Sequence, residues 1–301
     1  MITMANDNKI QKTADLASLI SSVDVAKILG VNVATIKRWT DSGKLDCVKT
    51  AGGHRKFLLR HLAAFAMEHE KYSQRLSLLP LNDQVHLELS HQILHAKNSE
   101  LIPYVLERAV ACDQTSVKMV LDGLYMVHQN LAAIYDDLLA PVLHRIGELW
   151  MEGKLSVTEE HLASQTIRDG IIRLQDVVVN VEDNHEKVFV LTLSEELHDI
   201  PAKMAQHVVE ARGFQVLFSG QKTPAGDTRA VFESFHPARV YLSSVYTENV
   251  PKAQDEFIEL LDLCKEFEAG LYIGGNGLAQ LEFQDKKGFT RLNNFSDVQT
   301  A

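Results

Sequence analysis

The 301-residue sequence has only three cysteines, Cys47, Cys112 and Cys264, and they form no Cys-x-x-Cys pair. This scarcity disfavours a disulfide-stabilised fold and a zinc site built from cysteines. With 7 prolines and 16 glycines, the chain is also unlike fibrous or largely disordered proteins. No apolar run approaches the roughly 18–20 residues of a membrane-spanning helix. The amino-terminal segment lacks the basic-then-apolar pattern of a secretory signal. These absences predict a cytoplasmic protein without a membrane partner.

Charge is distributed unevenly along the chain, although the net charge is −10. Residues 1–72 contain 11 Lys and Arg against 7 Asp and Glu, whereas the remaining residues contain 19 against 33. A small basic segment on a large acidic body is typical of a DNA-contacting module carried by something else, although chance variation of surface charge gives the same pattern.

The patterning predicts a multidomain protein in five parts: a flexible tail at 1–20, a compact basic segment at 21–72, a linker at 73–84, a helical region at 85–182 and an α/β region at 183–301. In the helical region, apolar residues recur at helical spacing and predict a bundle of four or five helices. Helix breaks are expected near Asn98, Gln114, Pro141 and Gly153.

The carboxy-terminal region alternates short β-rich runs with amphipathic helical stretches. The predicted strands are 187–194, 214–220, 239–244 and 270–274, and the predicted helices are 202–212, 228–235 and 253–268. This alternation indicates a doubly wound parallel sheet of the Rossmann-like kind. Ligands of such sheets bind beyond the carboxyl ends of the strands.

The basic segment has the pattern of a helix-turn-helix. Ser22 can cap a helix that runs to about Leu29, Gly30 supplies the turn, and Asn32 can cap a second helix over 33–42. The two helices are expected to share a small core made of Val25, Ala26, Leu29, Val31, Ile36 and Trp39.

A wing is expected after the second helix, because Gly52-Gly53 permits a tight hairpin tip and Phe57 returns to the core. Cations beside such a tip can bind backbone phosphate, and cations on the outer side of the second helix can reach the major groove. The predicted DNA contacts are Thr35, Lys37, Arg38, Thr50, His54, Arg55 and Lys56. The stretches VAKILGVNVATIKRWTDSGKL and TAGGHRKF resemble the winged DNA-binding domain of MerR-family regulators.

In the helical region, Trp150 is followed after nine residues by Glu160-His161. If Gly153 bends the chain between them, the Trp150 ring and the polar side chains of Glu160 and His161 can face one flat ligand. The alternative is a core tryptophan and a surface Glu-His pair.

In the sheet region, Glu196-Leu197-His198-Asp199-Ile200-Pro201 follows the first strand directly. A histidine there can offer imidazole to a metal while Glu196 or Asp199 orients it, or it can simply cap the next helix. Small or short residues close the other strands and leave space for a bulky group, namely Thr223-Pro224, Ser243-Ser244-Val245 and Gly274-Gly275-Asn276-Gly277.

Together these motifs resemble the cobalamin-binding module, which has an acidic-x-His-x-x-Gly loop, a Ser-x-Leu step and a Gly-Gly pair. Here they read Glu196-x-His198-x-x-Pro201, Ser243-x-Val245 and Gly274-Gly275. The resemblance implies that His198 is the lower axial ligand of cobalt. It also implies that the bundle caps the upper face of the corrin with Trp150, Met151, Glu160 and His161, and that Asp199 and Thr223 belong to the cofactor site.

The whole layout resembles the cobalamin-dependent photoreceptor repressors of the CarH/LitR type. That resemblance implies a non-enzymatic homo-oligomer, a dimer or tetramer, that binds a double-stranded operator under control of adenosylcobalamin and light. Met151 stands where the best-understood photoreceptors have a cobalt-capturing histidine, and a methionine there can also be a core residue. Two alternatives are a MerR-like regulator with a cofactor-free domain controlled by a protein partner, and a corrinoid methyl carrier.

Overall fold

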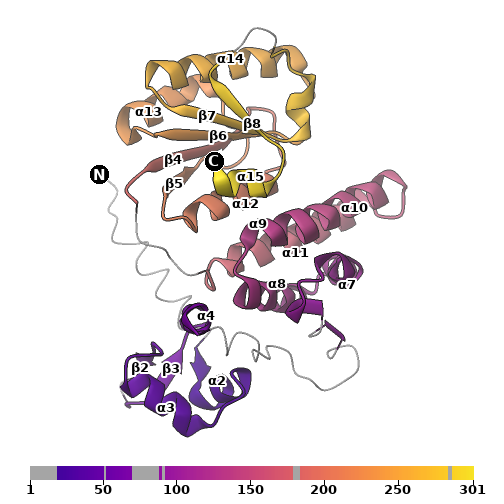
Figure 1. Cartoon of the computed structure of the whole chain (residues 1–301). Coiled ribbons are helices and arrows are strands. Elements are labelled where there is room, and N and C mark those ends of the chain that lie inside the picture. Colours follow the sequence, from indigo (N-terminus) through magenta and orange to yellow (C-terminus); the bar gives the residue numbers. More distant parts are fainter. Residues whose placement is uncertain (1–18, 51, 70–87, 90–91, 179–183, 284–286) are drawn as a thin grey trace. The chain divides into compact units, whose positions relative to one another are not determined.

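The computed structural model describes residues 19–50, 52–69, 88–89, 92–178, 184–283 and 287–301 (Figure 1). The chain divides into two compact units, Met1–Val179 and Asn180–Ala301. The predicted linker at 73–84 and nearly all of the predicted tail at 1–20 lie outside the described residues. In the described part of the chain, no helix combines the length and the apolar character needed to span a membrane.

The amino-terminal domain is a helix-turn-helix, as predicted. Helix α2 (Ser22–Ile28) and helix α3 (Val33–Asp41) are joined through Gly30, whose φ is +60°. Asn32 caps α3, because its side chain accepts a hydrogen bond from the Ala34 amide at 2.8 Å. Most of the predicted core is buried, namely Val25, Ala26, Leu29, Ile36 and Trp39. A further helix that was not predicted, α4 (Leu59–Glu68), packs the Phe65 ring 4.7 Å from the Trp39 ring.

The wing is a three-stranded antiparallel sheet in the order β1-β3-β2, with β1 (Ile20–Ser21), β2 (Val48–Lys49) and β3 (Arg55–Phe57). Its tip contains Gly53, whose φ of +76° favours glycine. The prediction that Ser22 caps α2 was wrong by one residue. The Ser21 hydroxyl accepts the hydrogen bond from the Asp24 amide at 3.2 Å, because the helix already includes Ser22.

The helical region forms the predicted bundle, made mainly of α7 (Asn98–Val110), α8 (Gln114–His128), α10 (Ala140–Met151) and α11 (Val157–Leu174). Its interior includes many of the residues whose spacing predicted it, namely Val105, Ala109, Val117, Val120 and Leu124. At Gly170 the helices α11 and α8 approach closely, since a Cβ there would lie 3.1 Å from Leu121.

Pro141 does not break the bundle, contrary to the prediction. The break lies earlier, at Gln129, which has a φ of +52°. From there one helical segment runs through α9 (Leu131–Ile134), the π-helical turn η1 (Tyr135–Leu139) and α10. The π turn directly precedes Pro141, whose ring would meet the carbonyl four residues earlier in a regular α-helix.

The second unit contains a five-stranded parallel sheet in the order β5-β4-β6-β7-β8. Its strands are β4 (Lys187–Thr192), β5 (Gln215–Phe218), β6 (Arg239–Ser243), β7 (Gly270–Gly274) and β8 (Phe289–Leu292). The first four confirm the predicted strands, and β8 was not predicted. Because β5 and β6 flank β4 on opposite sides, the strand order reverses beside β4, which is where such folds bind ligands.

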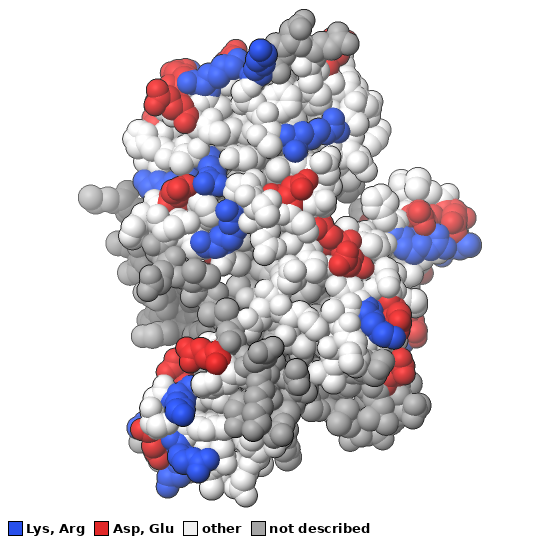
Figure 2. All heavy atoms as spheres, in the orientation of Figure 1, with Lys and Arg blue, Asp and Glu red and all other residues white. Residues whose placement is uncertain are grey.

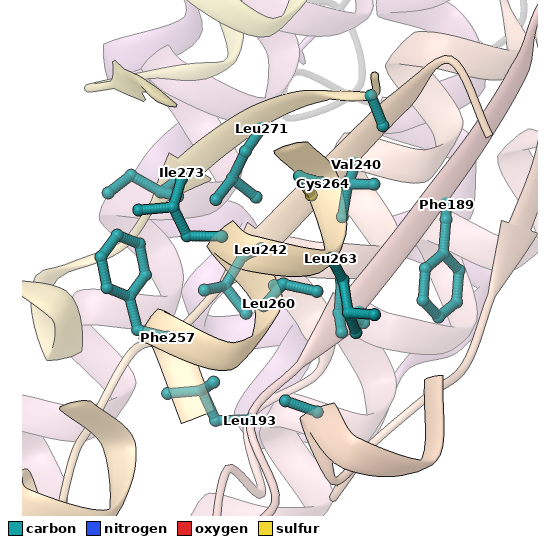
Figure 3. Close-up of a cluster of buried hydrophobic side chains, with 14 of the residues drawn as sticks. Phe189, Leu193, Val240, Leu242, Phe257, Leu260, Leu263, Cys264, Leu271 and Ile273 are labelled. Carbon is teal, nitrogen blue, oxygen red and sulfur yellow. The ribbon is translucent and has the colours of Figure 1, made fainter. Parts of the chain in front are cut away.

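Helices cover both faces of this sheet (Figure 1). Helices α12 (Ile200–Glu210) and α15 (Phe295–Thr300) lie on one face, and α13 (Arg229–Phe235) and α14 (Val250–Glu266) lie on the other. Figure 3 shows the core between the sheet and α14, where strand residues such as Val240 and Leu271 meet Phe257 and Leu260. Burial on both faces explains why the central strands are nearly continuous apolar runs in the sequence.

Candidate functional site

The loop that follows β4 pairs a buried carboxylate with an exposed imidazole. The Glu196 side chain is 1% exposed, whereas the His198 side chain is 57% exposed. Glu196 Oε1 lies 2.7 Å from His198 Nδ1 and accepts a hydrogen bond from the His198 amide, also at 2.7 Å. The carboxylate therefore holds both the ring and the backbone of the histidine.

The second oxygen of Glu196 binds the loop that follows β6. Oε2 accepts hydrogen bonds from the amides of Val245 and Tyr246, at 2.6 and 3.0 Å, and from the hydroxyl of Ser244 at 3.1 Å. Burial raises the pKa of Glu196, but the hydrogen bonds from His198, Tyr246 and Val245 outweigh burial and leave this pKa below its ordinary value. An ionised Glu196 thus joins the carboxyl ends of two adjacent strands.

This arrangement is suited to holding a metal through the histidine. A carboxylate at Nδ1 favours a proton on that nitrogen and leaves Nε2 as the nitrogen that a metal would bind. No group of three or more His, Cys, Asp or Glu side chains in the described residues could hold a metal ion by itself. The residues therefore fit a metal that brings most of its own ligands, such as the cobalt of a corrin.

Of the two adjacent serines at the end of β6, Ser244 is the one that contacts the carboxylate. Ser243 is the last residue of the strand and pairs with Thr192 and Gly274 in the neighbouring strands. Ser244 is fully buried and lies in the loop with Val245. Its contact with Glu196 was not predicted, because consecutive side chains of a strand end point to opposite faces and the sequence does not show which one meets Glu196.

Glycines after β7 allow a close approach of the loops that hold Glu196. Gly275 has a φ of +102°, and a Cβ there would lie 2.0 Å from the Ser244 carbonyl oxygen. At Gly277 a Cβ would lie 2.5 Å from the Ser244 hydroxyl. At Gly274 the nearest atom, the Leu292 carbonyl oxygen, would be 3.6 Å away, an ordinary contact. Gly275 and Gly277 are therefore demanded by packing, and Gly274 is not.

The loop after β5 supports the histidine loop. The Lys222 amide donates a hydrogen bond to the Glu196 carbonyl at 3.2 Å, and the Gln221 side chain donates one to the Leu197 carbonyl at 2.6 Å. The Thr223 hydroxyl donates within its own loop, to another hydroxyl at 2.7 Å. Thr223 therefore stabilises the supporting loop.

Asp199 and Pro201 mark the start of α12. Asp199 is buried at the position that precedes the helix, and Pro201 lies in its first turn. The missing proline amide costs no helical hydrogen bond there. Pro201 therefore stands in place of the glycine of the acidic-x-His-x-x-Gly motif without disturbing α12.

The remaining predicted cofactor contacts lie at the turn between α10 and α11. Trp150 and Met151 end α10 and are 47% and 73% exposed, so Met151 is not a core residue. Gly153, with a φ of +72°, turns the chain toward α11. Near the start of α11, His161 Nε2 lies 3.6 Å from Glu160 Oε2. One end of the hairpin thus presents an exposed indole and a Glu-His pair.

The predicted DNA contacts lie on α3 and the wing. On α3, Lys37 and Arg38 are exposed, whereas Thr35 is half-buried. At the wing, the Thr50 hydroxyl accepts a hydrogen bond from the His54 amide at 3.1 Å and thereby orders the tip. His54 is exposed and Lys56 is half-buried. Figure 2 shows Lys and Arg side chains gathered on this domain, at the lower left, beside Asp and Glu.

Arg55 differs from the other predicted DNA contacts because its charge is already paired. Its Nη2 lies 2.5 Å from Oδ1 of Asp41, the last residue of α3, and the Arg55 side chain is only 21% exposed. The sequence did not predict this ion pair between the wing and the second helix.

Two parts of the chain match known protein families. Residues 19–70 match the family of helix-turn-helix domains, and residues 105–175, which cover most of the bundle, match the B12 binding domain. The chain also has a fold similar to that of the monomethylamine corrinoid protein of Methanosarcina barkeri, which is 12% identical with a TM-score of 0.55 and covers 67% of this chain and 97% of that chain. Fold and matches together define a helix-turn-helix protein that carries a B12-binding domain.

A curated relative matches most of this chain. The HTH-type transcriptional repressor CarH of Myxococcus xanthus is 27% identical over 250 residues, which cover 78% of this chain and 82% of the relative. The chain is thus a homologue of the CarH type of transcriptional regulator.

Proposed function

We propose that this protein is a transcriptional repressor whose binding to operator DNA is controlled by bound cobalamin. One observation carries the proposal: a chain that begins with a helix-turn-helix domain also holds an exposed His198 on a buried, ionised Glu196 at the switch point of a parallel sheet. The match to a B12 binding domain and the similarity to the repressor CarH support it.

In this proposal His198 would hold the cobalt through Nε2. Glu196 holds the ring at 2.7 Å, and Ser244 fixes Glu196 in turn. Trp150, Glu160 and His161 would also contact the cofactor, to which the exposed indole offers a flat apolar surface. When bound, adenosylcobalamin supplies a cobalt–carbon bond that green light can break. We infer that this is the form bound and that light is the signal.

The DNA-binding part of the proposal rests on α3 and the wing. Lys37 and Arg38 project from α3 and are suited to phosphate or guanine contacts in the major groove. A single domain of this size makes few contacts, so several copies in a cytoplasmic dimer or tetramer would supply affinity through multivalency. The cofactor then acts by favouring one assembly over another.

An absorbance experiment tests the proposed binding of cobalamin. The full chain is incubated with adenosylcobalamin in the dark, freed of unbound cofactor by gel filtration, and its spectrum is recorded before and after green light. His198→Ala should lose the histidine-bound spectrum and most of the retained cofactor. His236→Asn is the matched control, because His236 is also exposed but lies at the start of the loop before β6, at the opposite end of the strands. Absence of corrin absorbance in the wild type would instead favour a regulator controlled by a protein partner.

A corrinoid methyl carrier is the second candidate, because the fold also resembles a corrinoid protein. The exposed cations on α3 argue against it, since a carrier has no use for a helix that reads a DNA groove. Methyl transfer from methylcobalamin-loaded protein to a thiol acceptor, with no selection of any DNA duplex, would favour the carrier.

A further inference from the structure

We propose that Arg55 does not contact DNA but acts as a positioning residue, a latch that joins the wing to α3 through Asp41. The inference rests on the proposed DNA-binding function, because the latch matters only if both elements bind one duplex. It assigns Asp41 a role in DNA binding although its charge is of the wrong sign for a phosphate contact.

The geometry of the pair carries the inference. Arg55 Nη2 lies 2.5 Å from Asp41 Oδ1, and the Nε of Arg55 is buried without a hydrogen-bond partner in the described part of the chain. The Arg55 side chain is only 21% exposed, whereas Lys37 and Arg38 on α3 are exposed. The guanidinium of Arg55 is thus directed into the domain.

The latch connects the two elements that have to fit the duplex together. Arg55 begins β3, the central strand of the wing sheet, and Asp41 ends α3. A carboxylate at the carboxyl end of a helix is disfavoured by the helix dipole, so Asp41 is stabilised there chiefly by a cation from elsewhere. The Thr50–His54 hydrogen bond orders the wing tip, and the latch sets the angle of that ordered wing to α3.

Two explanations of Arg55 predict opposite effects of Asp41→Asn. If Arg55 contacts phosphate, removal of a nearby negative charge leaves DNA binding equal or tighter. If Arg55 is a latch, the same change frees the wing and weakens specific binding although the domain becomes more positive. Asp46→Asn is the matched control, because Asp46 is an exposed acidic residue of the same domain with no ion pair among the described residues.

The binding test uses the full chain and a 30-base-pair duplex enriched from a random pool by the wild type, with a scrambled duplex for comparison. Asp41→Asn and Arg55→Gln should each weaken binding to the enriched duplex about tenfold, and the double variant should be no weaker than either. The salt dependence should stay unchanged, and the charge-swapped pair Asp41→Arg with Arg55→Asp should recover part of the affinity. Wild-type affinity in Asp41→Asn, or a salt slope lowered by ~1 in Arg55→Gln, would overturn the latch.

A second measurement needs no DNA. Hydrogen exchange of amides in residues 48–57 should be faster in Asp41→Asn than in the wild type or Asp46→Asn. Unchanged exchange would refute the latch directly. If the wild type enriched no duplex at all, the proposed function would fail, while the exchange result would still decide whether the pair holds the wing.

Discussion

A Cβ on Gly275 would lie 2.0 Å from the carbonyl oxygen of Ser244, so these two residues pack together only because position 275 is glycine. Ser244 donates a hydrogen bond to Glu196, and Glu196 holds His198. The loop after β7 is therefore linked through Ser244 and Glu196 to the histidine that follows β4.

Gly275→Ala should accordingly displace the Ser244 loop and loosen His198. We expect a loss of at least about 2 kcal/mol in unfolding free energy, because the residue would have a positive φ in addition to the clash. Cobalamin retention should fall with it. Gly274→Ala is the control, since its Cβ would meet only an ordinary contact at 3.6 Å. Urea unfolding and gel filtration with cobalamin check both, and equal behaviour of the two variants would contradict this assignment.

Glu196→Gln should destabilise the second unit at neutral pH. The Glu196 pKa is lowered in the folded state, so its charge stabilises the fold above pH ~4.5, the ordinary value, and this contribution is lost as the pH falls through the lowered pKa. The loss at pH 7 should be about 2 kcal/mol, because both oxygens accept strong hydrogen bonds.

The difference between wild type and Glu196→Gln should therefore persist from pH 7 to about pH 4.5 and shrink below that value in urea titrations extended to about pH 3. Glu195→Gln serves as the control, because Glu195 is 43% exposed and forms only a surface ion pair with Lys252. A constant difference at every pH would show that the Glu196 charge does not matter.

Asp122→Asn should stabilise the bundle in mildly alkaline solution. Burial raises the pKa of Asp122 to about 6, against an attraction to Lys118, and the nearby Asp176 raises it further. The folded state thus binds this proton more tightly than the unfolded state, and wild-type stability should rise as the pH falls through about 6. The variant lacks this dependence and should gain up to ~3 kcal/mol at pH 8 and nothing near pH 4.

Thermal unfolding across that pH range measures the effect of Asp122→Asn. Asp137→Asn, at an exposed position of the same bundle, should leave stability unchanged. A destabilised Asp122→Asn at pH 8 would mean that the ion pair with Lys118 outweighs the burial of the carboxylate.

Arg38→Ala should weaken binding to the enriched duplex and lower the salt slope by ~1 if the exposed guanidinium contacts phosphate. Lys265→Ala, an exposed cation of the other unit, should change neither quantity. Fluorescence anisotropy at several salt concentrations measures the affinity and the salt slope of both variants. An unchanged affinity for Arg38→Ala would remove α3 from the DNA interface.

Much of the architecture follows from local patterns. The cap at Asn32, the turn at Gly30, the helical spacing of the bundle and the alternation of strands and helices are encoded within a few residues of each other. Prediction from local patterns failed at two places. Pro141 did not end its helix, because a π turn precedes it, and β8 was missed because its FTRL sequence has only one buried side chain.

The sequence by itself determined which residue types are present at each strand end, including a histidine and a carboxylate two residues apart in the loop after β4. Only the tertiary structure decided that Ser244 rather than Ser243 meets Glu196, that Gly275 and Gly277 serve loop packing, and that Arg55 binds Asp41. The physical reason is that these contacts join residues 14 to 48 positions apart, and the parallel pairing of strands and the docking of the wing set their distances.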